Sequence, residues 1–242
     1  MLFPPPKAQR MVPELLPTKI PDGWPSTRLE PVPPRLGIPP NPLFHLLQIP
    51  RTLREPSGKT QVRALLKSLL RHWGMEDWRL EETPKGPRLL PPHKQDSPLR
   101  ISISYAAPDA WLGLAWGAEV GIDAVRIQAF EELEEVADLY LPGGARALRT
   151  AESPEKSFAL AWARLESCLK MDGRPLQEGG SLPPCLTLAR RWEGFAIAAS
   201  FRALPGFETQ WPDASPSPGN GLLTPAPRDA SRRSAFDFRA EV

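Results

Sequence analysis

The stretch Trp162-Ala-Arg-Leu-Glu166-Ser-Cys-Leu-Lys170 lies in the middle of a predicted helix that spans residues 154–171. Apolar side chains recur along this segment with the spacing of a single helix face: Phe158, Trp162, Leu165 and Leu169. Signals that start and stop a helix stand at its two ends: Ser153, Pro154 and Gly173. The pattern therefore predicts one long helix with a buried apolar stripe.

Two charged residues of this helix, Glu166 and Lys170, lie one helical turn apart and flank the apolar stripe. The simplest interpretation is an ion pair on the helix surface, and for an arbitrary helix that interpretation is the more frequent one. Arg164 is expected on the opposite, solvated side of the helix. A second carboxylate further up the chain favours a different role for Glu166.

That carboxylate is Asp123, which lies in a predicted strand, residues 119–125. Two further strands precede it, residues 101–105 and 111–116, and the three together predict a meander. Aspartate is disfavoured inside strands, and one surrounded by apolar residues requires a partner or a metal. The alternative is that Asp123 turns the chain into a helix around residues 130–140, and the local sequence leaves both interpretations open.

The segment Gly121-Ile122-Asp123 followed by Trp162-xxx-Glu166-Ser-xx-Lys170 resembles the paired motifs of the 4'-phosphopantetheinyl transferases. The resemblance is to the double-length, monomeric type that activates carrier proteins, and it covers about residues 53–201. It implies an α+β fold built as a pseudo-dimer of two similar α+β halves, each with a small antiparallel sheet and a long helix. It also implies an active site between the two halves.

The resemblance implies a reaction as well. Members of the family transfer 4'-phosphopantetheine from coenzyme A to a serine of an acyl or peptidyl carrier protein, using Mg²⁺ and releasing adenosine 3',5'-bisphosphate. Carried over to this chain, Asp123 and Glu166 hold the metal, and Glu166 takes the serine proton directly or through water. Lys170 acts as a point charge toward phosphate. The remaining expected coenzyme A contacts are basic or hydrogen-bonding residues: Arg54, Arg63, Lys85, Ser104 and Tyr105.

The chain departs from the family pattern at four of its positions. Val125 replaces an acidic residue, Leu165 a lysine, and Tyr105 a histidine, while Lys85 stands one place early. If the missing lysine limits activity, restoring it at position 165 is expected to raise turnover. A non-catalytic relative that binds coenzyme A or a carrier protein as an interaction or regulatory protein is therefore the alternative. An unrelated α+β domain with coincidental motifs is a third possibility.

Composition fits an intracellular enzyme, and we expect a cytoplasmic location. The net charge of +2 is too small to argue for nucleic acid, and no apolar run is long enough to predict a membrane span. The two cysteines, Cys168 and Cys185, are expected to be ordinary thiols in a reducing compartment.

Four segments are expected along the chain. Residues 1–50 form a proline-rich arm, residues 51–118 a first α+β half, residues 119–205 a second half with the metal site, and residues 206–242 a flexible tail. A helix over residues 59–73 serves the first half, and a hairpin of residues 185–189 and 195–201 closes the second.

Overall fold

The structure, a computed structural model, describes residues 44–50, 57–72, 75–83, 86–92, 97–179 and 182–207, together with the backbone of residues 17–19. Arg54 and Lys85 lie outside the described residues, as do most of the predicted arm and tail. The described chain is a mixed α+β fold with small, largely antiparallel sheets, as the sequence predicted. No helix in these ranges is long and apolar enough to cross a membrane.

The first sheet has four strands in the order β1-β2-β6-β5. Its strands are β1 (Pro17–Lys19), β2 (Phe44–Pro50), β5 (Leu99–Ala106) and β6 (Asp109–Trp116). β1 runs parallel to β2, and the other pairs are antiparallel. Because β2 pairs with β6 along its whole length, the last seven residues of the expected arm, 44–50, belong to this sheet.

The second sheet has three antiparallel strands in the order β7-β9-β8. They are β7 (Ala118–Arg126), β8 (Leu186–Trp192) and β9 (Phe195–Ala203), so the predicted hairpin is confirmed. The predicted meander is wrong, because β7 does not pair with β6 but crosses to β9. Gly117, at a φ of 74°, joins β6 to β7 in a backbone conformation that glycine adopts without strain, and there the chain leaves the first sheet.

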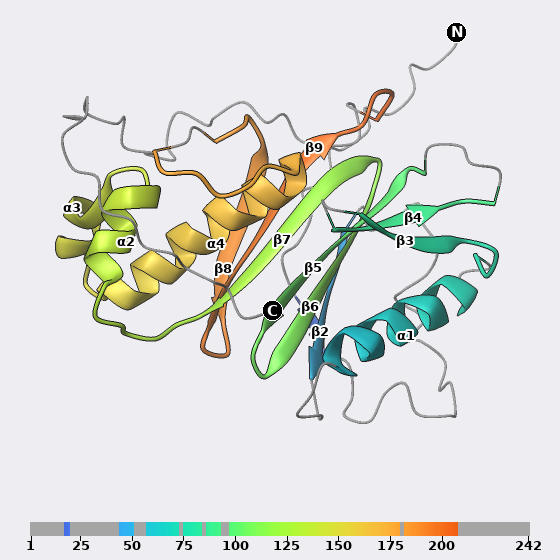
Figure 1. Ribbon diagram of the computed structural model, residues 1–242, viewed down its shortest axis with the longest axis horizontal. Coiled ribbons are helices and arrows are strands. Elements are labelled where there is room, and N and C mark those ends of the chain that lie inside the picture. The colour runs from blue at the N-terminus through green and yellow to red at the C-terminus, as the bar shows by residue number, and fades with distance from the viewer. Residues whose placement is uncertain are drawn as a thin grey trace, which may run out of the picture.

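The two sheets pack face to face, and one long helix covers each outer face (Figure 1). Side chains of the first sheet alternate between α1 (Ser57–His72) on one face and the second sheet on the other. Leu112 and Leu114 face α1, for example, whereas Trp111 and Ala115 face the second sheet. α4 (Pro154–Asp172) lies on the outer face of the second sheet, so the layer order is helix, sheet, sheet, helix.

Smaller elements complete the described fold. β3 (Arg79–Thr83) and β4 (Gly86–Leu90) form a separate hairpin beside α1. α2 (Leu133–Tyr140) and α3 (Gly144–Arg149) pack against α4 around a third apolar cluster that includes Phe158 and Leu165. Both long helices were predicted within two residues of their observed ends, and Gly173 at a φ of 64° ends α4.

Candidate active site

Gly121 and Asp123 share the face of β7 that is turned toward α4. Alternation along the strand places Val120, Ile122 and Ala124 in the core between the sheets, and therefore Gly121 and Asp123 on the other face. A Cβ atom at Gly121 would lie 2.0 Å from the carbonyl oxygen of Ser167 and 2.4 Å from the backbone nitrogen of Met171. Only glycine allows α4 to approach β7 this closely.

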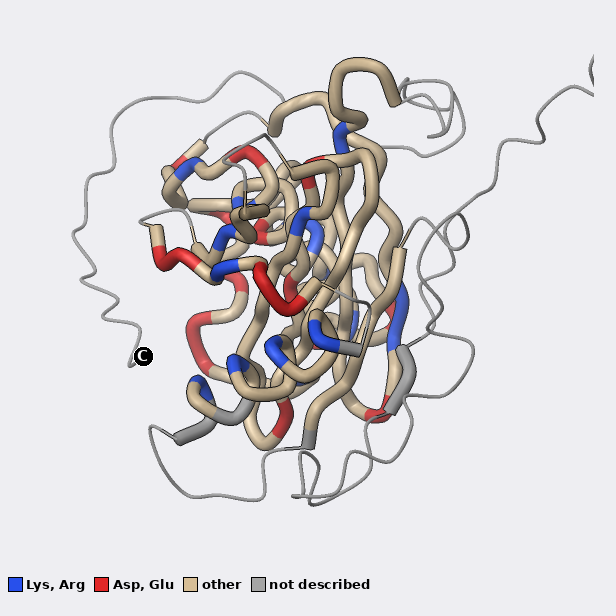
Figure 2. The backbone as a smooth tube through the Cα atoms, turned by 90° about the vertical axis from the view of Figure 1, so that its right-hand side faces the viewer, with Lys and Arg blue, Asp and Glu red and all other residues tan. Residues whose placement is uncertain are grey.

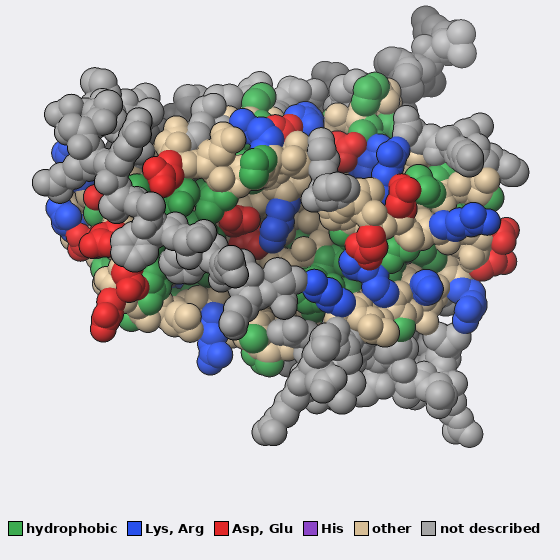
Figure 3. Space-filling model, in the orientation of Figure 1, with side chains coloured by type: hydrophobic (Ala, Val, Ile, Leu, Met, Phe, Trp, Pro, Cys, Tyr) green, Lys and Arg blue, Asp and Glu red, His purple; other side chains and the backbone are tan. Residues whose placement is uncertain are grey.

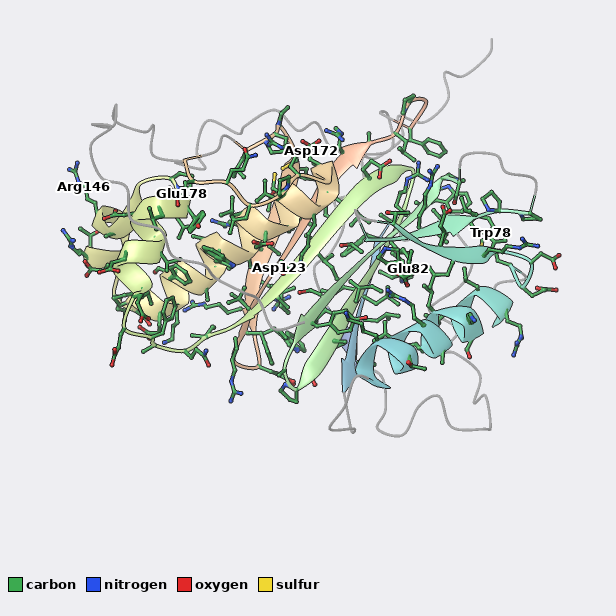
Figure 4. All side chains as sticks on the ribbon, viewed as in Figure 1. Trp78, Glu82, Asp123, Arg146, Asp172 and Glu178 are labelled. Atoms are coloured by element: carbon green, nitrogen blue, oxygen red, sulfur yellow. The ribbon has the colours of Figure 1, made fainter. Side chains whose placement is uncertain are left out.

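Asp123 is buried, with 6 % of its surface exposed. Its Oδ1 accepts a hydrogen bond of 2.6 Å from Lys170 Nζ on α4 and one of 2.9 Å from Ser104 Oγ on β5. Three elements therefore meet at one carboxylate, and Figure 4 shows Asp123 between β7 and α4. The ammonium group and the hydroxyl together provide hydrogen-bond partners for a buried carboxylate.

Glu166 lies one turn before Lys170 on α4 and is half-buried. Burial raises the pKa of its carboxyl above the ordinary value, the charge of Asp123 raises this pKa further, and Lys170 opposes both effects. Within the described ranges, no hydrogen bond or ion pair ends on this carboxylate. Asp123 and Glu166 therefore repel each other, and Lys170, which is paired with Asp123, also favours the ionised form of Glu166. Acidic and basic side chains lie side by side near the middle of the face that carries α4 (Figure 3).

Two carboxylates are donors of the kind that magnesium accepts. No group of three or more His, Cys, Asp and Glu side chains that could hold a metal occurs among the described residues. Magnesium, however, commonly takes one or two carboxylates and completes its coordination with water and substrate phosphates. Asp123 and Glu166 supply two mutually repelling carboxylates, and the Glu166 carboxylate has no partner in the described part of the chain. A divalent cation beside them would offset their repulsion.

Ser104 and Tyr105 were both expected to contact coenzyme A, but they lie on opposite faces of β5. Ser104 is 3 % exposed; its hydroxyl donates to Asp123 and accepts the Ala124 N–H at 3.1 Å. Tyr105 packs against the core beneath α1. The structure therefore gives Ser104 a partner other than a phosphate, and it turns Tyr105 away from Asp123.

Arg63 is also remote from the carboxylate pair. Its guanidinium donates to both carboxylate oxygens of Glu82 on β3, at 2.6 and 2.9 Å. These two residues tie the β3–β4 hairpin to α1, on the side of the molecule opposite α4 (Figures 1 and 4). On this side, stretches of basic residues lie beside acidic ones (Figure 2). A phosphate that approached Arg63 would have to compete with Glu82.

The structure shows where the side chains at two departures from the family pattern, Leu165 and Val125, are packed. Leu165 is buried in the apolar cluster between α4 and α2, beside Phe158 and Leu133, and faces away from Asp123. A lysine at this position would enter that cluster, which argues against the expected rise in turnover. Val125 packs against the small residues Ala159 and Ala163 of α4, on the same face of β7 as Asp123.

Sequence reasoning did not find the serines that join the two sheets. Ser102 Oγ accepts the Ile122 N–H at 2.9 Å, just as Ser104 accepts that of Ala124, so β5 is held to the edge of β7 by hydroxyl groups. The alternation of residues 101–105 predicted this strand, and Ser104 was expected to contact coenzyme A, but neither expectation indicated a hydrogen bond to β7. Their small size at successive positions of one strand face was the available signal.

No family model matches the chain, and a search of curated proteins gives no match either.

Proposed function

We propose that this protein transfers 4'-phosphopantetheine from coenzyme A to a serine of an acyl or peptidyl carrier protein, with Mg²⁺ as cofactor. The observation that carries the proposal is the convergence of Asp123, Glu166 and Lys170 where α4 crosses β7. In the sequence these residues belong to two motifs about forty positions apart. Their meeting in three dimensions supports the resemblance on which the proposal rests.

Each residue has a role in this reaction. Asp123 and Glu166 would hold Mg²⁺, which when bound supplies positive charge to the pyrophosphate oxygens of coenzyme A. Glu166 accepts the proton of the attacking serine hydroxyl, and a raised pKa suits a carboxylate to that task. Lys170 holds Asp123 through its ammonium group and presents positive charge to the departing phosphate.

The two-half architecture is part of the proposal, and the order of the strands supports it. In each sheet the first strand of the half lies beside the last, since β2 pairs with β6 and β7 pairs with β9. A long helix follows the first strand in each half, and a hairpin, β5–β6 or β8–β9, closes it. We propose that the halves form a pseudo-dimer within a monomer that acts in the cytoplasm, where coenzyme A and carrier proteins are present.

A non-catalytic relative is the second candidate, and specific contacts favour it. Arg63 is paired with Glu82, and Tyr105 packs beneath α1. Neither of these two expected coenzyme A ligands therefore faces Asp123. Val125 adds no third carboxylate beside Asp123. A protein of this kind would bind coenzyme A or a carrier protein without transferring the phosphopantetheine group.

Isothermal titration with coenzyme A, with and without Mg²⁺, separates the candidates. Binding that requires Mg²⁺ supports the transferase, metal-independent binding supports the non-catalytic relative, and the absence of binding supports an unrelated α+β domain. Glu166→Gln should abolish the Mg²⁺-dependent binding, because it removes a carboxylate that would hold the metal. Lys170→Ala should weaken binding more mildly, because it removes one of several contacts. Glu152→Gln is the matched control, since Glu152 is exposed just before α4.

A further inference from the structure

The two cysteines of the chain meet between α4 and β8. Cys168 lies on α4, Cys185 directly precedes β8, and the sequence contains no other cysteine. Cys168 Sγ donates to the carbonyl oxygen of Pro183 at 3.6 Å, two residues before Cys185, and each thiol shifts the pKa of the other. Cys168 is 1 % exposed, whereas Cys185 is partly exposed. The pair therefore has one member that a small reagent reaches and one that only its neighbour reaches.

A chain of hydroxyl groups surrounds the two thiols. Ser167 Oγ and Ser200 Oγ are 2.8 Å apart, and Ser200 Oγ and Thr187 Oγ1 are 2.9 Å apart. Thr187 Oγ1 is in turn hydrogen-bonded to Cys185 Sγ at 3.3 Å. Hydroxyl donors aimed at a sulfur stabilise its thiolate form, which is the nucleophilic form of cysteine.

The surroundings of Cys185 also favour its thiolate form. Hydrogen bonding to Cys168, opposed by burial and aided by hydrogen bonding to Thr187 and Ser200 and by the positive charge of Arg202, lowers the pKa of Cys185 to about 6. A partly exposed thiol with this environment reacts faster with electrophiles than an ordinary cysteine does.

We propose that Cys185 and Cys168 form an oxidation site that reacts with a hydroperoxide and closes to an intramolecular disulfide. The Cys185 sulfur attacks the OH-bearing oxygen of the hydroperoxide, forming an S–O bond as the O–O bond breaks. The leaving alkoxide, or hydroxide from hydrogen peroxide, takes the proton of the Cys185 thiol and departs as an alcohol or water. This step gives a sulfenic acid on Cys185. The Cys168 sulfur then attacks the Cys185 sulfur, the S–O bond breaks, and hydroxide leaves as water with the Cys168 proton. Two thiols are oxidised by two electrons, and one hydroperoxide is reduced.

The bond would tie α4 to the strand behind it. Cys168 stands between Glu166 and Lys170 in sequence, and Cys185 stands at the start of β8. A disulfide here would therefore fix the helix that carries two of the three candidate site residues. The oxidation site itself does not depend on the proposed transferase activity.

The test treats the reduced full-length protein with hydrogen peroxide, alkylates the remaining thiols with iodoacetamide and measures the intact mass. Wild type should lose two hydrogens and take up no alkyl group. A tryptic digest without reductant should contain the peptide of residues 165–170 linked to that of residues 171–190. Two alkyl groups after peroxide treatment, or disulfides between molecules, would overturn the proposal.

Two variants assign the roles of the thiols. Cys168→Ser, or Cys168→Ala if the serine variant is unstable, should leave a sulfenic acid on Cys185 that dimedone traps. Cys185→Ser should react with peroxide at least about tenfold more slowly than wild type, because Cys168 is buried. Equal rates for Cys185→Ser and wild type would show that Cys185 is not the attacking thiol, and the proposal would be wrong.

Discussion

Glu166 carries a carboxylate that burial and a neighbouring negative charge both push toward the neutral form. In the metal-free protein, its titration midpoint should therefore lie above the ordinary value for glutamate. Asp123→Asn should lower this midpoint by removing the negative neighbour, and Lys170→Met should raise it by removing the positive one. Carboxyl NMR of the labelled protein measures all three midpoints. If the Glu166 midpoint did not change in Asp123→Asn, the two carboxylates would not interact, and this prediction would be wrong.

The same shift has a consequence for stability. Because folding raises the pKa of Glu166, the folded state favours the neutral carboxyl, and this contribution is present below the unfolded-state pKa. It is lost as the pH rises through the folded-state pKa. Added Mg²⁺ should therefore raise the thermal midpoint most at neutral pH, where Glu166 is ionised, and least in acid.

Leu165 shows why a motif position cannot be restored without regard to packing. It is buried among Phe158 and Leu133, so Leu165→Lys would place an ammonium group in an apolar cluster. We expect the free energy of unfolding to fall by about 2–4 kcal/mol, as measured by urea denaturation. Leu165→Met, the control, should cost less than about 1.5 kcal/mol. An unchanged free energy in Leu165→Lys would mean that this face of α4 is open to solvent.

At the scale of elements, two serines of β5 offer a matched pair. Ser102 and Ser104 each accept a backbone N–H from β7, but only Ser104 also donates to Asp123. Ser102→Ala and Ser104→Ala should each cost about 1 kcal/mol of stability. Only Ser104→Ala should weaken Mg²⁺ binding, by roughly tenfold or more, because it releases a carboxylate that would hold the metal. Titrating the Mg²⁺-induced rise in thermal midpoint measures both variants. Equal Mg²⁺ affinities would refute the positioning role of Ser104.

The contact of α4 with β7 depends on one glycine. In Gly121→Ala the new methyl group would meet the Ser167 carbonyl oxygen at 2.0 Å, and backbone cannot move aside as a side chain can. We expect a loss of about 3 kcal/mol in the free energy of unfolding, together with weaker Mg²⁺ binding as the helix shifts. Gly206→Ala is the control, since its Cβ meets nothing within 4 Å and costs only about 1 kcal/mol for a φ of 87°. Similar losses in the two variants would contradict the close approach.

Local periodicity predicted most of the helices and strands, but not which strands pair with one another. The alternation of residues 101–105 and 111–116 gave β5 and β6, and the helical spacing around Trp162 gave α4. The meander failed because a strand pattern fixes which side chains share a face, not which distant strand pairs with it, and β7 selects β9. β2 was not predicted because prolines precede and follow it, although its own residues 44–49 are largely apolar.

At the scale of the whole molecule, the same limit applies to the site. The paired motifs predicted that Asp123, Glu166 and Lys170 act together. In the structure Lys170 contacts Asp123 where α4 crosses β7, and Glu166 interacts electrostatically with both. The surroundings of the residues expected to contact coenzyme A depend on how the two sheets and their helices are placed relative to one another, which no local pattern encodes. For this reason Ser104 and Arg63 have partners that the sequence did not indicate.

The proposed activity is tested most directly by incubating the protein with coenzyme A, Mg²⁺ and a panel of apo carrier proteins, and then measuring the intact mass of each carrier. The account predicts that at least one carrier gains the mass of a single phosphopantetheine group. It also predicts that removal of Mg²⁺ or the change Glu166→Gln abolishes this gain while the circular dichroism spectrum is unchanged. Undiminished transfer in Glu166→Gln would show that another residue performs the chemistry. No mass gain on any carrier, together with no affinity for coenzyme A in the presence of Mg²⁺, would contradict the account.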